Sequence, residues 1–144
     1  MPLIRKLETR DDLNALHDGN IKESISLEYK GSGAIEKKDD AKKLEMARDV
    51  SAFANADGGQ IVYGMTEKDH EPAGLDKELD AKTYPEIWFE QVLQQHVTPN
   101  IPGLRIRHVP LSNGRVAVVI DIPAVAYPVD SGSSIYSGYA GLMG

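Results

Sequence analysis

Two short segments, Ser24-Ile-Ser-Leu-Glu-Tyr-Lys30 and Gln60-Ile-Val-Tyr63, enclose a long helical pattern that runs from about residue 36 to residue 56. The first segment alternates between polar and apolar residues, which predicts a strand with one core face. That face consists of Ile25, Leu27 and Tyr29. The helical pattern ends at Asp57-Gly58-Gly59, where a glycine can adopt a left-handed cap. A strand, a long helix and a second strand in this order predict a crossover unit with parallel strands.

The sequence on either side predicts further helices and one long loop. Thr9 and Asp12 have the spacing of a capping box, so residues 1–20 are expected to form a helical lead-in. The acidic stretch 66–82 has no sustained period and is expected to be a loop. Pro85 then suits the first turn of another helix, whose apolar stripe begins at Trp88.

A β-hairpin is the clearest local prediction. Asn113-Gly114 lies between the apolar segments 104–111 and 115–122, and this dipeptide favours a type I′ turn. A regular register would place Leu111 opposite Val116, Val109 opposite Val118 and Arg107 opposite Ile120. The expected fold class is therefore α/β of the mixed α+β kind, a single compact domain with a mixed sheet, a crossover helix and a C-terminal hairpin.

Composition narrows the functional classes. The chain has 144 residues, a net charge of −6 and no cysteine. The absence of cysteine excludes disulfides, cysteine-ligated zinc and a cysteine nucleophile. No apolar run is long enough to span a membrane and no signal peptide is recognisable, so a cytoplasmic protein without membrane partners is expected.

The negative charge disfavours nonspecific, charge-driven binding to nucleic acid, but its distribution is uneven. Residues 67–90 carry eight acidic side chains and three lysines, whereas residues 101–144 carry three arginines and two aspartates. A local basic face is therefore compatible with the negative total. The contact candidates on it are Lys37, Lys38, Lys42, Arg105 and Arg107. Alternatively, Asp39 and Asp40 pair with the lysines along the helix, and the arginines are edge-strand charges.

Glu28 and Lys30 form the best candidate for catalytic chemistry. They lie two residues apart on one face of the predicted strand, with Glu23 close to its start. Carboxylates can hold Mg²⁺ or Mn²⁺ for phosphodiester hydrolysis, while a lysine offsets charge on the reacting phosphate. A solvated ion pair on an exposed sheet face is the alternative interpretation.

Two glycine-containing loops are further candidates for ligand binding. Asn55, Gly58 and Gly59 would let a ligand approach the backbone closely, or would simply end the helix. Gly31-Ser-Gly33 follows a strand, but the chain contains no complete phosphate-binding motif of the nucleotide-hydrolysing enzymes.

Several of these segments together resemble the Schlafen-type AlbA-like domain. The resemblance rests on Glu23 to Lys30, on Val50-Ser-Ala-Phe-Ala-Asn-Ala-Asp-Gly-Gly59, on Gln60 to Gly64 and on Gly74-Leu75, and it extends over residues 21–130. The family is described as a DNA-binding domain of bacterial and archaeal regulators. The resemblance implies a compact α/β domain that associates with DNA or RNA in a regulatory setting.

In animal Schlafen relatives the resemblance also implies a metal-dependent RNA endonuclease with three carboxylates. Two of them match Glu23 and Glu28, while Thr66 stands where an aspartate is expected. Glu67 is the remaining candidate for the third ligand, although a shift of one residue along a strand turns a side chain to the other face.

The end of the chain departs from the family pattern. Residues 131–144 form a tail rich in serine, glycine and tyrosine, without the arginine that relatives carry there, which indicates either a fragment of a longer protein or a divergent end. Three functions stay open. They are a nucleic-acid-associated regulatory domain, a Mg²⁺- or Mn²⁺-dependent RNA endonuclease, and a non-catalytic interaction module that recruits partners or dimerises through its hairpin edge.

Overall fold

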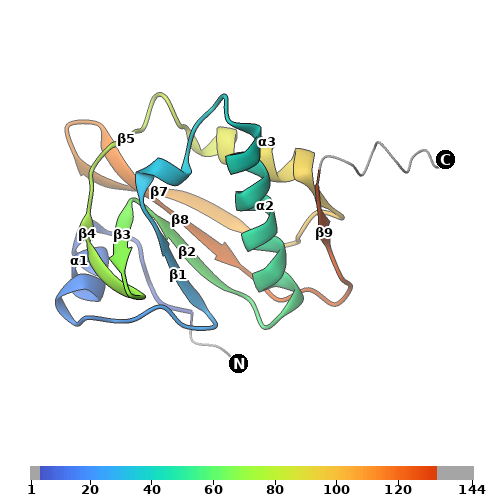
Figure 1. The fold of residues 1–144 in the computed structure, drawn as a ribbon, viewed down its shortest axis with the longest axis horizontal. Helices are drawn as coiled ribbons and strands as arrows, with labels where there is room; N and C mark the ends of the chain where they lie inside the picture. The colour runs from blue at the N-terminus through green and yellow to red at the C-terminus, as the bar shows by residue number, and fades with distance from the viewer. Residues whose placement is uncertain (1–3, 133–144) are drawn as a thin grey trace.

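The computed structural model describes residues 4–132, so residues 133–144 of the predicted tail lie outside this range. Figure 1 shows how its helices and strands are arranged. The helices are α1 (Arg10–Asp18), the 3-10 helix η1 (Ser32–Ala34), α2 (Asp40–Asn55) and α3 (Glu86–His96). The strands are β1 (Leu27–Lys30), β2 (Gly59–Tyr63), β3 (Met65–Lys68), β4 (Glu71–Leu75), β5 (Leu79–Asp80), β6 (Val97–Thr98), β7 (Arg105–Ser112), β8 (Arg115–Ile122) and β9 (Asp130–Ser131).

The central sheet is mixed, as predicted. Strand β1 pairs in parallel with β2, with Glu28 opposite Ile61 and Lys30 opposite Tyr63, which confirms the crossover through α2. Strand β8 lies antiparallel to both β2 and β7, and β5 pairs with its first residues. Strand β1 therefore forms one edge of this sheet, and α2 runs beside it (Figure 1).

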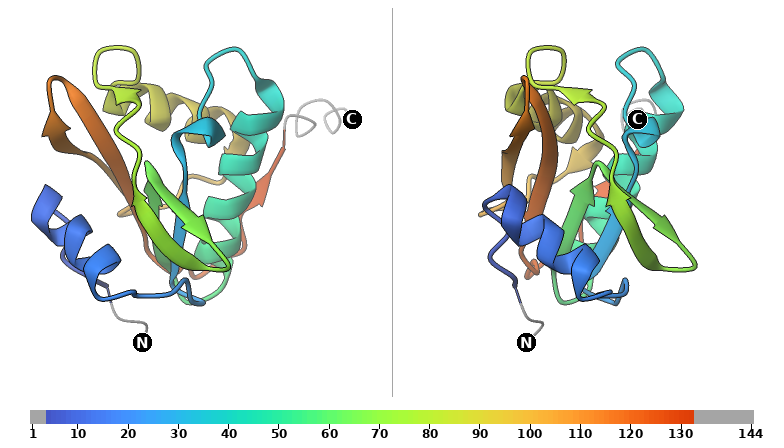
Figure 2. Two further views of the ribbon diagram at one scale, coloured as in Figure 1. Left: turned by 60° about the vertical axis from the view of Figure 1, so that its left-hand side comes forward. Right: turned by 90° about the vertical axis from the view of Figure 1, so that its left-hand side faces the viewer.

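Apolar side chains cover both faces of the sheet. On one face, residues such as Ile61, Tyr63 and Ile120 pack against α2 and α3. On the other face, Val62 and Val119 pack with α1 and the segment before it. Figure 2 shows α1 and α2 on opposite sides of the strands. Strand β2 is buried along its whole length because the two layers enclose it.

The predicted capping box at residues 9–12 and the predicted hairpin over residues 104–122 are both present in the structure. Thr9 and Asp12 form a capping box at the start of α1. Asn113 and Gly114 have φ values of 52° and 76°, as the type I′ turn between β7 and β8 requires. The predicted register is wrong by one residue, because the ladder shifts between Pro110 and Ser112. Proline cannot donate a hydrogen bond to the ladder, and bulges commonly accommodate it.

The prediction of a loop over 66–82 is wrong. Strands β3 and β4 form a hairpin whose turn residues Asp69 and His70 have positive φ values of 54° and 69°. A turn of this kind usually contains glycine or asparagine, so the sequence gives little sign of it. Only Met65 and Pro72 of its two strands are buried, which explains the absence of apolar alternation.

Strand β1 and helix α2 both begin later than predicted. Ser24 pairs with Leu27 across a tight turn, and this turn leaves Ile25 85% exposed instead of in the core. Helix α2 begins at Asp40 because the Asp39 side chain accepts a hydrogen bond from the Lys42 amide and caps the helix. Across residues 4–132, no helix combines the length and apolar character that a bilayer crossing requires.

Candidate functional site at the edge of the sheet

Glu28, Lys30 and Asp49 form a charged cluster where strand β1 meets α2. Lys30 Nζ lies 3.4 Å from Glu28 Oε2 and 3.3 Å from Asp49 Oδ2. The neighbours Leu27 and Tyr29 point into the opposite core layer, so alternation along the strand turns Glu28 and Lys30 toward α2. The predicted shared face of Glu28 and Lys30 is thus present, and α2 adds a second carboxylate to it.

Partial burial changes the titration of all three groups. Desolvation is the main cause that raises the pKa of Glu28 and of Asp49, because it penalises the charged form. Burial by itself lowers the pKa of Lys30, but attraction to Asp49 and Glu28 outweighs it, and the pKa is raised overall. One ammonium therefore lies between two carboxylates, and the cluster carries an excess negative charge when all three groups are ionised.

Two buried oxygens, one in this cluster and one beside it, have no hydrogen-bond partner among the described residues. They are Asp49 Oδ2, which has only the ionic contact with Lys30, and the hydroxyl oxygen of Tyr63. Tyr63 is opposite Lys30 in the strand pairing and is 1% exposed. Burial raises the pKa of Tyr63 well above its ordinary value, so this hydroxyl stays neutral at physiological pH.

Glu23 lies at the entrance to the same region, in contact with the tip of the β3–β4 hairpin. Its Oε2 accepts a hydrogen bond from the Tyr29 amide at 2.8 Å, and its Oε1 lies 2.9 Å from Nδ1 of His70. An open pocket of about 340 Å³ is lined by Glu23, Glu28, His70, Ser24, Leu27 and Phe53. The two predicted carboxylates Glu23 and Glu28 therefore face one pocket.

Thr66 and Glu67 have different roles from those the family pattern suggests. Thr66 Oγ1 donates a hydrogen bond to the Gly74 carbonyl and so stabilises the hairpin. The β3–β4 register shifts between Thr66 and Glu67, and a bulge of this kind re-aims the side chain that follows it. Glu67 is consequently not turned away, because ligand atoms of Glu67, Glu23 and His70 lie within 4.8 Å of one another.

The predicted basic contacts divide into two groups. Lys37 and Lys38 precede α2 and are exposed, and Lys42 is in its first turn. Arg105 instead pairs with Glu8 at 3.1 Å, and Arg107 is 7% exposed. The Arg107 guanidinium donates to the Leu7 carbonyl and pairs with Asp121, so it contributes to the protein interior.

Asn55, Gly58 and Gly59 hold the end of α2 against neighbouring chain. The Asn55 side chain exchanges two hydrogen bonds with the backbone of Val129, at 2.8 and 2.9 Å. Gly58 has a φ of 85°, and a β-carbon there would lie 2.6 Å from the Ile122 carbonyl oxygen. At Gly59 a β-carbon would lie 2.5 Å from the Phe53 ring. The most specific part of the sequence pattern therefore has a structural explanation.

Sequence reasoning missed Asp49 and His70. Asp49 had a weak signal, since it is an acidic residue in the half of α2 that is otherwise rich in buried apolar residues. His70 had none, because its contact with Glu23 spans 47 positions and depends on a hairpin that was not predicted.

Comparisons with known proteins support the fold and identify the family. The crystal structure of the DIP2311 protein from Corynebacterium diphtheriae is similar, with a TM-score of 0.53 and 18% sequence identity over 85% of this chain. The chain spans only 22% of the length of that protein's chain. No curated protein matches the chain.

The pattern that describes the Schlafen, AlbA_2 family matches residues 23–138, which is most of the chain. The match includes Glu23, the β1 cluster, the end of α2 and the β7–β8 hairpin. This family points to a nucleic-acid-related domain. The chain belongs to the Schlafen, AlbA_2 family.

Proposed function

We propose that this chain binds DNA or RNA as a regulatory domain, with Lys37, Lys38 and Lys42 as its principal phosphate contacts. The observation that carries this proposal is that, within residues 4–132, none of these three lysines forms an ion pair. Among the four lysines within residues 37–43, only Lys43 pairs with an aspartate, which is Asp40 at 3.7 Å. Neutralisation by the interleaved acids therefore reaches Lys43 but not the other three cations, which are available for phosphate, although Lys37 Nζ also lies 5.8 Å from the centroid of the Tyr84 ring.

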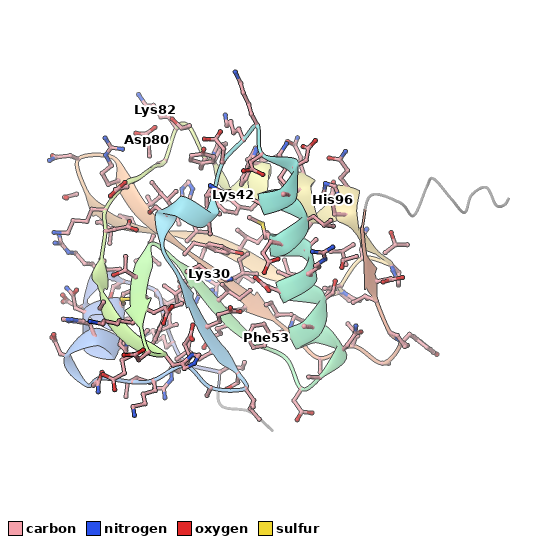
Figure 3. All side chains as sticks on the ribbon, in the orientation of Figure 1. Lys30, Lys42, Phe53, Asp80, Lys82 and His96 are labelled. Carbon is pink, nitrogen blue, oxygen red and sulfur yellow. The ribbon has the colours of Figure 1, made fainter. Side chains whose placement is uncertain are left out.

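The surface beside these lysines supports the proposal. Figure 3 shows Lys42, Lys30 and Phe53 in this order along the boundary between α2 and β1. Near the end of α2, a pocket combines the apolar groups of Phe53, Ala52 and the exposed Ile25 with the Glu28 and Asp49 carboxylates. Cationic groups that contact phosphates, next to an aromatic side chain that can contact a base, are typical of single-strand binding surfaces.

Fluorescence anisotropy with single-stranded and duplex probes, in EDTA and over a range of salt concentrations, tests this function. Exchanging Lys37, Lys38 and Lys42 for alanine should weaken binding and reduce the slope of log K against log salt by about 2 to 3. The matched control exchanges three exposed lysines elsewhere on the surface, Lys6, Lys68 and Lys82, which changes the net charge equally.

Equal losses in the two triple variants would mean that only net charge matters. In that case the assignment of the contact to residues 37–42 would be wrong. Absence of salt-dependent binding by the wild-type chain would refute nucleic-acid binding itself.

A divalent-metal-dependent RNA endonuclease is the second candidate function. The observation in its favour is that Glu23 and Glu28 line one pocket, with Lys30 adjacent to Glu28. Carboxylate oxygens suit Mg²⁺ or Mn²⁺, and such an ion would supply Lewis acidity toward a phosphate. In this reaction Glu23 and Glu28 would hold the ion and Lys30 would stabilise charge on the phosphate.

Cleavage of a labelled single-stranded RNA in Mn²⁺ tests this second function. We expect Glu28→Ala to abolish cleavage while the probe still binds in EDTA. Unchanged cleavage by Glu28→Ala would exclude an endonuclease that holds its ion through Glu28.

A further inference from the structure

We propose that His70, Glu67 and Glu23 form a binding site for a divalent transition-metal ion that accepts an imidazole ligand, such as Mn²⁺ or Zn²⁺. The site lies at the tip of the β3–β4 hairpin, beside the pocket of the second candidate function. The proposal rests on that function only for the use of the ion, since binding of the ion requires no RNA.

The backbone brings the three side chains together from three places in the chain. Glu23 precedes β1, Glu67 follows the bulge in β3, and His70 occupies the turn between β3 and β4. The Glu23 amide donates to the His70 carbonyl at 2.8 Å, so the hairpin tip is fastened to the segment before β1. One potential ligand atom from each side chain lies within 4.8 Å of the other two.

Hydrogen bonds orient these ligands. Glu23 is held through Oε2 by the Tyr29 amide, and only 16% of its side chain is exposed, so Oε1 is presented toward His70. Glu67 Oε2 accepts the His70 amide at 3.0 Å, which holds its carboxylate beside the turn. Fixing a carboxylate through its second oxygen is how proteins orient metal ligands.

The donor set distinguishes between metals. Two carboxylate oxygens and one imidazole nitrogen suit Mn²⁺ or Zn²⁺, whereas Mg²⁺ prefers oxygen ligands alone and retains its waters. Three protein ligands leave coordination positions open for water or for an anionic oxygen. The His70 side chain is 80% exposed, so an ion can reach the site without opening the fold.

The proposal differs from the expectation based on three carboxylates in two respects. It replaces the missing aspartate at position 66 with an imidazole from the hairpin turn, and it leaves Glu28 with Lys30. Because Lys30 Nζ is 3.4 Å from Glu28 Oε2, this carboxylate already has a cation beside it. Among the described residues, the hydrogen-bond partners of the Glu23 carboxylate are the Tyr29 amide and His70 alone.

Isothermal titration of Mn²⁺, Zn²⁺ and Mg²⁺ into the metal-free full chain, without nucleic acid, tests the site. We expect one Mn²⁺ or Zn²⁺ to bind per chain, with His70→Asn weakening that binding at least about tenfold. Asparagine tolerates the positive φ of this turn, so the variant keeps the hairpin. His17→Asn is the matched control, because His17 is an exposed histidine on α1 and, within residues 4–132, belongs to no such cluster.

Glu67→Gln should weaken the same binding, whereas Glu90→Gln, at an exposed glutamate on α3 outside the cluster, should not. In ¹H–¹⁵N spectra, Mn²⁺ should broaden the amide signals around residues 67–71 first. Equal affinity in wild type, His70→Asn and Glu67→Gln would overturn the proposal. Anisotropy in EDTA reports nucleic-acid binding separately, and RNA cleavage is a third readout, so failure of this site is distinguishable from failure of either proposed function.

Discussion

Asp49 lies on the side of α2 that faces Lys30, and its carboxylate is largely removed from water. Its Oδ2 has the Lys30 ammonium at 3.3 Å but no hydrogen bond within residues 4–132. Desolvation raises its pKa, which means that the ionised form is less stable in the folded chain than in the unfolded one. A residue that lowers stability at neutral pH is a candidate for a functional role.

At this residue we predict a gain in stability on removal of the charge. Asp49→Asn should raise the urea midpoint at pH 7, because the penalty of the buried carboxylate disappears. The same variant should weaken nucleic-acid binding if Lys30 needs Asp49 to hold it in place. Asp57→Asn is the control, since Asp57 is exposed just beyond the same helix.

The pH dependence of this effect has a definite sign. A carboxyl group with a raised pKa contributes no penalty below its ordinary value of 3.8, where it is protonated in both states. The penalty develops as the pH rises from this ordinary value to the raised one, and it is fully present above the raised value. The advantage of Asp49→Asn over wild type should therefore be larger at pH 7 than at pH 4. Denaturation series at both pH values measure it, and a larger advantage at pH 4 would contradict the account.

Asn55 gives a contrasting prediction at the same scale. Asn55→Ala removes both hydrogen bonds to the Val129 backbone, and we expect a loss of about 1–3 kcal/mol in the free energy of unfolding. Nucleic-acid affinity measured on the folded fraction should remain that of wild type. A fall in that affinity without a fall in stability would show that Asn55 contacts the ligand.

At the scale of elements, the junction from α2 to β2 depends on a glycine. Gly58→Ala should destabilise the chain by about 2 kcal/mol or more, since the positive φ and the Ile122 carbonyl both oppose a β-carbon. Gly33→Ala is the matched control, because a β-carbon at Gly33 has no atom within 4 Å. Thermal denaturation of the two variants measures the difference, and similar midpoints would refute the explanation.

The two hairpins show which elements a sequence reveals. Asn113-Gly114 specifies its turn through residues that adopt positive φ readily, so the β7–β8 hairpin was predictable. Asp69-His70 adopts a similar turn with residue types that do so less often, and the β3–β4 hairpin was missed. Even the predicted hairpin had the wrong register, because a bulge at Pro110 depends on pairing with β8 beyond the turn itself.

The candidate site shows the same limit. Glu28 and Lys30 could be placed on one face because the period of a strand is a local property. Asp49 and His70 reach the site through long-range pairing of α2 and of the missed hairpin. Local patterns thus identified the site residues on β1, whereas the residues that contact them could be identified only from the three-dimensional fold.

At the scale of the whole molecule, two apolar layers share one sheet, so we expect them to unfold together. Leu13→Ala, at a fully buried position in the α1 layer, should lower the free energy of unfolding by about 2–5 kcal/mol. Trp88, the single tryptophan, reports from the opposite layer. The unfolding midpoint measured by Trp88 fluorescence and the midpoint measured by far-UV circular dichroism of the chain should shift to the same new value. Ile25→Ala, at an exposed position, should change stability by less than about 0.5 kcal/mol.

Separate midpoints for the two probes in Leu13→Ala would contradict this prediction. They would show that the α1 layer unfolds independently of the layer that contains α2 and α3.

The central place of β8 in the sheet has a consequence for synthesis on the ribosome. Strand β2 is buried on both faces and pairs with β8 along one side, yet Ile122 is made long after Tyr63. A nascent chain that has completed the β1–α2–β2 unit therefore presents an apolar strand with an open side. Such intermediates are prone to aggregate, so we expect chaperone contact to end only when translation has passed β8.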